Sequence, residues 1–295
     1  MSKQKNKKRK KTFGDYLLLF IFLIGLGILS YPVISRMYYQ INSTSVINDF
    51  EAGKSKLDIK EINRRIDLAK AYNYSLISGG TGYRDPYSKK QKEEGRKEYA
   101  RMLEINEKMG HIKVPKINID LPIYAGTSEK VLQKGVGHLE GTSLPVGGPD
   151  THAVLTAHRG LPTAKLFTDL DKLQIGDTFY VYNIKEPLAY QIDSKKVIEP
   201  SEFQDLMISE NHDYVTLLTC TPYMINSHRL LVRGHRIPYV KAKDKKETME
   251  GKVRNWKKIM LIALPIIIIL AIYIRKKIVN KKKHNKSEKE RRGND

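Results

Sequence analysis

Two long apolar segments without charged residues constrain this chain more than any other feature. Residues 16–34 contain no charged side chain, and neither do residues 259–274. A helix needs ~20 consecutive apolar residues to cross the hydrocarbon core of a bilayer. The first segment has nearly that length, and Trp256, Lys257 and Arg275 flank the second, where they extend it into the membrane interface. The sequence therefore predicts transmembrane helices at 16–34 and 258–275.

Each segment has a plainer alternative. The first could be a cleaved signal peptide, but such peptides have an apolar stretch of roughly 7–15 residues and a small-residue cleavage site. Here the longer stretch runs into Ser35-Arg36-Met37, which is no such site. The second could be a buried core helix of a soluble domain, but basic residues cluster on both of its sides.

The positive charge is concentrated at the two ends of the chain. Residues 1–15 and 257–295 together carry +15 of the net charge of +21. Basic residues mark the cytoplasmic ends of membrane spans, so both tails are expected in the cytoplasm and the intervening segment outside the cell membrane. An excess of positive charge that is confined to the tails also argues against a nucleic-acid-binding face.

The outer region divides into two parts. Residues 35–110 read as helical, with Ile59, Ile62, Ile66, Ala69 and Tyr72 forming an apolar stripe at three- or four-residue spacing. Glycines interrupt this pattern in a loop near 79–90. Residues 111–240 consist of short β-branched and aromatic segments separated by Gly and Pro, which predicts an all-β sandwich or barrel. Residues 241–257 form a linker, and residues 276–295 a solvated basic tail.

Three residues at strand ends form a candidate chemical site. Cys220 is the only cysteine, which excludes an internal disulfide and a cysteine-rich zinc site. It closes the strand-like segment 214–220, His158 closes the segment 153–158, and Arg229 opens the segment after Cys220. Taken singly, they read as a small buried residue, a satisfied histidine and a surface ion pair.

Together the three side chains suit acyl transfer. A thiolate is a nucleophile, imidazole donates a proton to a leaving amine, and guanidinium stabilises an oxyanion. His228 is adjacent to Arg229 and competes with His158 for the imidazole role. His138, His152 and His235 also lie in this region.

Longer motifs resemble the sortase family. Residues 216–220 (TLLTC) match its TLxTC signature, with Arg229 nine residues on, and residues 156–160 (TAHRG) match its histidine segment. The stretches 121–127 (LPIYAGT), 135–145 (GVGHLEGTSLP) and 220–223 (CTPY) look like the pilin-polymerising class C branch. The resemblance covers about residues 45–240. It implies a mostly β fold: a closed sortase-type barrel with short helices, preceded by a helical and lid region and flanked by two membrane helices.

The resemblance also assigns roles. It implies that Cys220 is the nucleophile, His158 the acid and base, and Arg229 the residue that binds the oxyanion or positions the substrate. Class C sortases carry a lid with an Asp-Pro-aromatic anchor, which Asp85-Pro86-Tyr87 matches. Asp85 is then expected to pair with Arg229 while the Tyr87 ring covers the Cys220 thiol. The family more often has Trp or Phe at the third position, so Tyr87 departs from the pattern.

The resemblance further implies the substrates. Sortases cut an LPXTG-like sorting signal between Thr and Gly through a thioester, and class C members pass the acyl group to a lysine of another pilin subunit. The expected partners are pilins or surface proteins that bear such a signal, and the bilayer. No cofactor, metal or nucleic acid is expected. The alternatives are a sortase that anchors proteins to peptidoglycan and, in another class, a non-enzymatic two-span surface scaffold.

Overall fold

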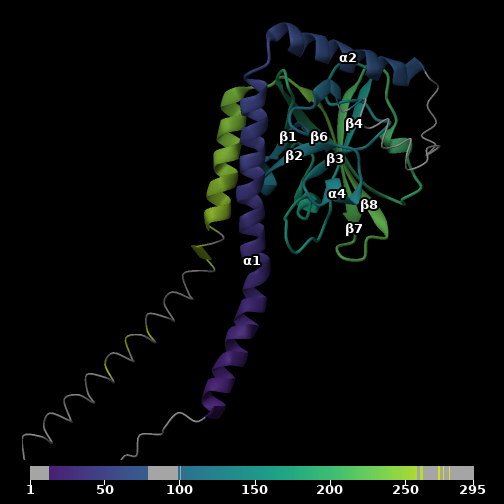
Figure 1. Ribbon diagram of the computed structural model, residues 1–295. Coiled ribbons are helices and arrows are strands. Elements are labelled where there is room, and N and C mark those ends of the chain that lie inside the picture. The colour runs from purple at the N-terminus through teal and green to yellow at the C-terminus, as the bar shows by residue number, and fades with distance from the viewer. Residues whose placement is uncertain are drawn as a thin grey trace, which may run out of the picture. The chain divides into compact units, whose positions relative to one another are not determined.

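The computed structural model describes residues 13–78, 99, 101–257, 260–261, 272, 275 and 279. The chain forms two compact units, residues 1–239 and residues 240–295. The first unit holds two long helices and a β-barrel (Figure 1). In the second, the described residues from 241 onward are helical.

Two helices precede the barrel. Helix α1 spans Phe13–Lys54 and includes the first predicted membrane segment, with Pro32 inside it. Helix α2 spans Ile59–Ser78. Within the described residues, no helix combines the length and the apolar character that crossing a membrane requires. Both membrane spans stay predictions, and most of the second lies outside the described residues.

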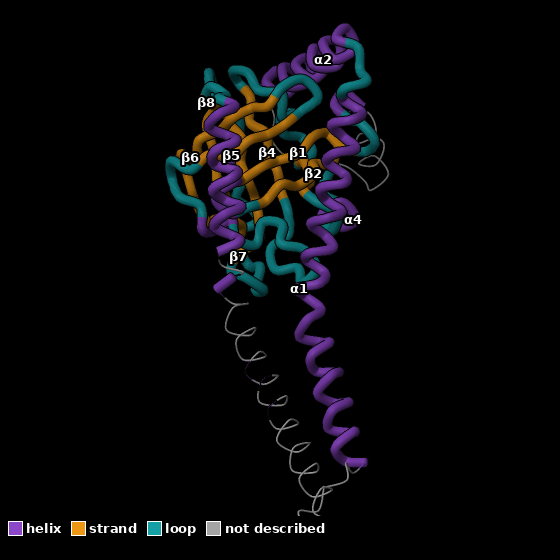
Figure 2. Tube along the Cα trace, turned by 90° about the vertical axis from the view of Figure 1, so that its left-hand side faces the viewer, coloured by secondary structure: helices purple, strands orange, loops and turns teal. Residues whose placement is uncertain are grey.

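Eight strands close into a barrel in the order β1-β2-β3-β4-β7-β8-β6-β5 (Figure 2). This closed barrel confirms the fold class that the strand pattern predicts. Its elements are β1 (Lys108–Val114), η1 (Pro115–Ile117), β2 (Ile119–Ala125), α4 (Glu129–Leu132), β3 (Val136–His138), β4 (Thr151–Thr156), η2 (Leu170–Lys172), β5 (Thr178–Tyr182), β6 (Pro187–Ile198), η3 (Gln204–Leu206), β7 (Asp213–Thr221) and β8 (His228–Ile237).

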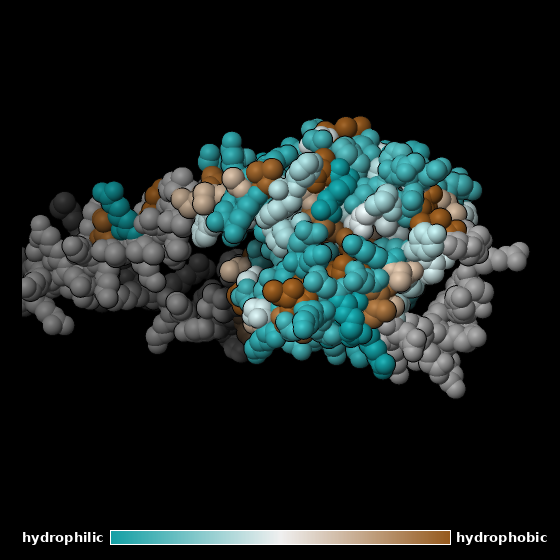
Figure 3. All heavy atoms as spheres, turned by 90° about the horizontal axis from the view of Figure 1, so that it is seen from above, coloured by the Kyte–Doolittle hydropathy of each residue, from teal (hydrophilic) through white to brown (hydrophobic). Residues whose placement is uncertain are grey.

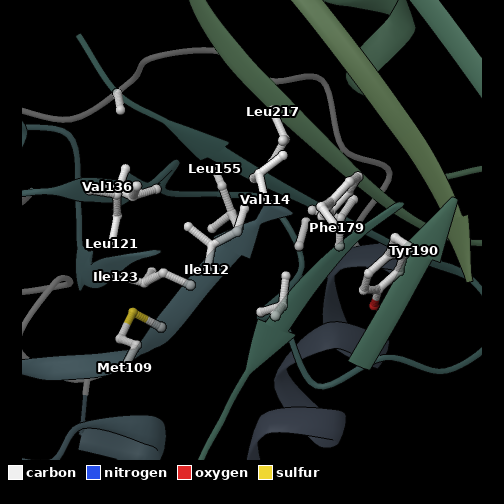
Figure 4. Close-up of a cluster of buried hydrophobic side chains, with 14 of the residues drawn as sticks. Met109, Ile112, Val114, Leu121, Ile123, Val136, Leu155, Phe179, Tyr190 and Leu217 are labelled. Atoms are coloured by element: carbon white, nitrogen blue, oxygen red, sulfur yellow. The ribbon is translucent and has the colours of Figure 1, made fainter. Parts of the chain in front are cut away.

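The barrel interior follows from the alternation of side chains along each strand. On β7, Val215 and Leu217 are buried in the main core cluster, where Leu217 lies close to Leu155 of β4 (Figure 4). Successive residues of a strand point to opposite faces, so Thr216 and Leu218 lie on the outer face. Fully burying one such aliphatic side chain contributes about 1.5–3 kcal/mol, so the filled interior holds the strand ends in place.

Both long helices pack against the barrel. On α2, Ile66 and Ala69 are buried, whereas Ile59, the first residue of the helix and of the predicted stripe, is 72% exposed. The buried Asn73 fixes α2 to the loop before β4: its Nδ2 donates to the Leu144 carbonyl at 3.0 Å, and the Leu144 amide donates to its Oδ1 at 2.7 Å. A side chain that binds both backbone groups satisfies polar atoms that burial would otherwise leave unpaired.

The outer face of β4, β7 and β8 is partly covered by the connection from β6 to β7. Leu206 of that connection packs with Val154 and Leu231 in a small second cluster, against which Leu139 and Leu218 lie half-buried. Much of the surface elsewhere is polar, with apolar side chains scattered over the face that Figure 3 shows. The covered patch therefore ends in a partly open apolar strip that runs toward the carboxyl end of β7.

Candidate active site

Cys220 lies next to the last residue of β7, an interior strand of the barrel between β4 and β8. Its neighbour Thr219 is buried, and the Thr219 hydroxyl donates to the Ala157 carbonyl at 2.7 Å. Because side chains alternate, Cys220 faces outward on the same side as Leu218 and Thr216. The thiol is free and half-buried, as a nucleophile that must reach a substrate requires.

Arg229 lies directly opposite Cys220 in the antiparallel pair of β7 and β8. Directly paired residues put their Cβ atoms ~4.5–5.5 Å apart on one face of a sheet. One terminal guanidinium nitrogen, Nη1, donates to the carbonyls of Asn226 and His228, both at 3.1 Å. These bonds are local, and in the described part of the chain no carboxylate pairs with Arg229. Its other donors are therefore free to bind a developing oxyanion.

His158 reaches the same end of the barrel from β4. Strands β4 and β7 run parallel with Thr156 opposite Leu218, and the Ala157 amide still donates to the Leu218 carbonyl at 3.2 Å. His158 and Cys220 each lie two residues beyond that last pair. Since neighbouring strands are ~4.8 Å apart and side chains repeat every two residues, both side chains lie at one level of the outer face.

A carboxylate that sequence reasoning missed accompanies His158. Glu129, the first residue of α4, places its Oε1 3.1 Å from His158 Nε2. A hydrogen bond from Gln133, followed by the charge of His158 and its hydrogen bond, holds the pKa of Glu129 below its usual range. Glu129 precedes His158 by 29 residues, and no spacing rule connects a short helix to a strand end at that distance.

Three other histidines of the barrel have different surroundings. His138 is buried, and burial lowers its pKa to about 4, so it is neutral and binds the Ser143 carbonyl at 2.8 Å. His152 is buried against the Thr216 hydroxyl at 2.7 Å. His228 pairs with Thr221, so it faces the side opposite to Cys220. Of these candidates and His158, only His158 lies on the face and at the level of the thiol.

Some predicted features lie outside this geometry. The predicted lid residues Asp85 and Tyr87 lie outside the described residues. Among the residues that are described, no group of three or more His, Cys, Asp or Glu is placed to hold a metal ion. The absence of a metal or cofactor requirement stays a prediction.

The described geometry supports nucleophilic chemistry. A thiol from β7, a guanidinium from β8 and an imidazole two residues beyond the end of β4 lie at one end of the barrel. The imidazole can take and return a proton, and the guanidinium can bind negative charge that develops on a carbonyl oxygen. Such a set suits covalent acyl transfer through a thioester.

Comparisons with known proteins place this arrangement in a family. A family model described as a sortase domain matches residues 112–237. Sortase A of Bacillus anthracis is 28% identical over 128 residues, which cover 43% of this chain and 58% of that protein. The chain thus matches little more than half the length of this curated relative.

Solved structures match over a longer region. Sortase C1 of GBS pilus island 1 is 60% identical with a TM-score of 0.62, covering 68% of this chain and 94% of that one. A lid mutant of Streptococcus agalactiae sortase C1 is 57% identical with a TM-score of 0.60, covering 66% of this chain and 99% of that one. From the barrel, the family model and these matches, the chain belongs to the sortase family of cysteine transpeptidases, in its class C branch.

Proposed function

We propose that this chain is a transpeptidase that cleaves an LPXTG-like sorting signal between Thr and Gly and transfers the acyl group to a lysine amine of a pilin subunit. The observation that carries the proposal is the convergence of Cys220, Arg229 and His158 on one face at one end of the barrel. The similarity to sortase C1 of GBS pilus island 1 supports a pilin as the acceptor.

The first half-reaction forms the thioester. The Cys220 thiolate attacks the carbonyl carbon of the signal's threonine, and the oxygen takes up negative charge that Arg229 binds. The carbon–nitrogen bond then breaks, and protonated His158 gives its proton to the departing glycine amine. This leaves the acyl group on sulfur and His158 neutral.

The second half-reaction reverses the roles. The nitrogen of the incoming neutral lysine amine attacks the thioester carbon, and neutral His158 takes the proton that this nitrogen loses. The carbon–sulfur bond breaks and the thiolate leaves, so a new amide bond replaces the one that was cut. Arg229 binds the oxyanion in both halves, because the same carbonyl carbon is attacked each time.

The apolar strip beside the three residues supports an apolar peptide as the acyl donor. Leu218 lies on the outer face two residues before Cys220, and half-buried Leu139 lies against the same cluster. A Leu-Pro pair upstream of the cleaved bond can cover this strip and remove apolar surface from water, with about 25 cal/mol gained per Å². The threonine carbonyl then lies at the strand end, within reach of the thiol.

We also propose that the barrel lies outside the cell membrane, anchored by two spans with both tails in the cytoplasm. The N-terminal part of α1 supports this, because apolar side chains described there are exposed: Phe20 is 61% and Ile28 is 69% exposed. Exposed apolar rows of this kind need a bilayer or another protein surface to cover them. The basic residues of 1–15 and 276–295 support the orientation.

Mass spectrometry of the full-length chain in detergent tests the chemistry. Incubation with an LPXTG-containing peptide should add the fragment that ends at threonine to Cys220 and release the glycine fragment. A peptide with the same residues in scrambled order is the control, and Cys220→Ala should give neither product. Transfer that persists in Cys220→Ala would overturn the proposal.

The acceptor is tested separately. A pilin with a free lysine and a peptidoglycan-like amine should compete for the preformed thioester. We expect the pilin lysine to resolve it faster. Faster resolution by the peptidoglycan-like amine would favour a cell-wall-anchoring sortase instead.

A further inference from the structure

Arg159 is a buried cation directly beside His158. Only 8% of its side chain is exposed. Residues 158 and 159 follow the end of β4, where alternation sends their side chains in opposite directions. Burying a guanidinium is costly unless each of its donors finds a partner, so its contacts show what the position is for.

The Arg159 guanidinium contacts two other segments of the chain, residues 168–171 and Thr221. Its Nη1 donates to the Thr221 hydroxyl at 2.9 Å, and its Nη2 lies 2.8 Å from the Asp171 carboxylate. Its Nε donates to the Thr168 carbonyl at 3.3 Å. Thr221 is the residue after Cys220, and Asp171 lies in η2. The guanidinium therefore connects the residue after the predicted acid and base to the residue after the predicted nucleophile.

This connection begins where the strand pairing stops. The parallel ladder of β4 and β7 ends at Thr156 and Leu218, and the last backbone bond between them joins Ala157 to Leu218. At the level of His158 and Cys220, in the described part of the chain, no backbone hydrogen bond joins the two segments. Beyond the ladder, the Thr219 hydroxyl still donates to the Ala157 carbonyl, and the bond from Arg159 to Thr221 continues the connection past the level of His158 and Cys220.

The surrounding loop supports the same position. Gly160 follows Arg159 with φ +93°, and its amide donates to the Thr168 hydroxyl at 3.4 Å. A Cβ at Gly160 would lie 3.2 Å from the Tyr223 ring, so the chain turns closely against the loop after Cys220. The side chain of Arg159 and the backbone of Gly160 thus hold the histidine loop from both sides.

We propose that Arg159 is the positioning residue that sets the spacing of the His158 imidazole and the Cys220 thiol, by binding Thr221 on one side and Asp171 on the other. It touches neither substrate nor thiol and acts through its neighbours. The inference rests on the proposed function, since it assigns a role within that reaction. A misplacement of ~1 Å can cost about 10²-fold in rate, so loss of this link should be visible in kcat.

Substitutions of Arg159 separate the role of its planar guanidinium, a fork of several donors, from the role of its positive charge. Arg159→Gln should lower kcat for thioester formation by about 10- to 100-fold, with the KM for the sorting-signal peptide within about threefold, because the apolar strip is untouched. Arg159→Lys keeps the charge but not the planar fork, so it should recover only part of the rate. Thr221→Val removes the hydroxyl at nearly constant volume and should lower kcat about three- to tenfold.

The decisive readout is the pH profile of Cys220 alkylation in the full-length chain. In the wild type, His158 should contribute an inflection that His158→Ala removes. Arg159→Gln should resemble His158→Ala, and adding it to His158→Ala should change the profile no further. Arg236→Gln, at the other end of β8, is the matched control and should keep the wild-type profile. Thermal unfolding of each variant measures any general loss of stability.

Two results would overturn the inference. One is an Arg159→Gln variant that unfolds at lower temperature yet keeps the wild-type kcat and alkylation profile, which is a purely structural role. The other, informative even if Arg159→Gln does not fold, is a Thr221→Val variant with unchanged kcat and profile. Failure of the proposed function is distinguishable, because Cys220→Ala or His158→Ala would then remain active.

Discussion

Polar side chains have opposite surroundings at the two ends of the paired strands β7 and β8. At one end, Asp213 opens β7 close to Arg236 near the end of β8. At the other end, Cys220 lies opposite Arg229. The same two strands carry both pairs, separated by the length of β7, so the contrast between them reflects side-chain surroundings and not a difference in fold.

At the Asp213 end, which we call the closed end, the polar side chains are paired with one another and with the backbone. The Asp213 carboxylate accepts hydrogen bonds from the Gly148 amide at 2.9 Å and the Tyr190 hydroxyl at 3.0 Å, and Arg236 lies 3.9 Å away. Burial raises the pKa of Asp213, and these partners act against that shift. A cavity of about 320 Å³ lies beside this group, and none of the three predicted catalytic residues lines it.

The Cys220 end is open by comparison. The described hydrogen bonds of Arg229 go to two nearby backbone carbonyls. The partner of His158 is Glu129, whose side chain is 65% exposed. Polar groups that are already satisfied inside the protein have little left to offer a substrate. Reactive groups of this barrel therefore lie where internal pairing is incomplete, while fully paired groups hold the barrel together.

The largest effect should come from breaking the open end. Arg229→Ala should lower kcat/KM by about 10²–10³-fold, because an oxyanion donor is lost. The free energy of unfolding should change by less than ~0.5 kcal/mol, since only local backbone bonds disappear. Steady-state kinetics and denaturant unfolding measure the two quantities. An activity loss no larger than that of Arg236→Ala would contradict the assignment.

The closed end should show the reverse pattern. Asp213→Ala leaves the Gly148 amide and the Tyr190 hydroxyl without their acceptor, so it should lower the free energy of unfolding by about 2–4 kcal/mol. Activity per folded molecule should stay within about twofold of the wild type, because the site lies at the other strand end. Asp49→Ala is the control: this carboxylate is 53% exposed and pairs with Lys108, and its removal should cost about 1 kcal/mol or less. Equal destabilisation by both variants would remove the contrast.

His111, a buried histidine next to α1, offers a second test of a fully paired group, through the pH dependence of stability. His111 binds Asp120 at 2.6 Å and lies 3.6 Å from Glu51 of α1, with the Tyr182 ring stacked on it at 4.3 Å and Lys113 over that ring. Burial alone lowers the pKa of His111, but the two carboxylates outweigh burial and raise it. The folded state therefore holds the proton more tightly than the unfolded chain does.

The raised pKa of His111 fixes the direction in which stability changes with pH. A raised pKa contributes stability that is full below the unfolded value of about 6.5 and is lost as pH rises through the folded value. His111→Gln should thus lower stability by about 1–2 kcal/mol at pH 6 and by less at pH 9. Thermal unfolding of both proteins at the two pH values checks this, with His235→Gln as the control. A difference that grows toward pH 9 would show that His111 is neutral in the fold.

Sequence reasoning predicted the strand ends better than it predicted their neighbours. The strand-like segment 214–220 places Cys220 at a strand end, and β7 ends one residue later, at Thr221. Arg229 follows by an antiparallel return of the chain. The level of His158 depends on parallel pairing of β4 with β7, which local periodicity does not encode; only the motif resemblance connected it to Cys220.

Polar residues that bridge distant segments were missed for a related reason. The predicted apolar stripe of α2 omits Asn73 because its side chain is polar, yet Asn73 lies four residues after Ala69 on the same face and is buried against Leu144, 71 residues along the chain. Glu129 and Arg159 likewise look like ordinary surface charges. Their roles come from partners that the barrel topology brings near, and hydrophobic spacing carries no information about such partners.

The smallest effect concerns the predicted lid, and it sharpens the view that the Cys220 end is open. Because no described carboxylate pairs with Arg229, Asp85 is a fitting partner for its remaining donors, and Tyr87 would then cover the thiol. Replacing Asp85 and Tyr87 with alanine should speed alkylation of Cys220 about three- to tenfold, the factor that corresponds to roughly 1 kcal/mol of lid contact. Asp67→Ala with Tyr74→Ala, on the exposed face of α2, is the matched control.

If Asp85 acts through Arg229, then Arg229→Gln alone should give a similar acceleration, and the combined variant no further increase. Additive effects, or an unchanged labelling rate in the lid variant, would mean that the Cys220 end is uncovered at rest.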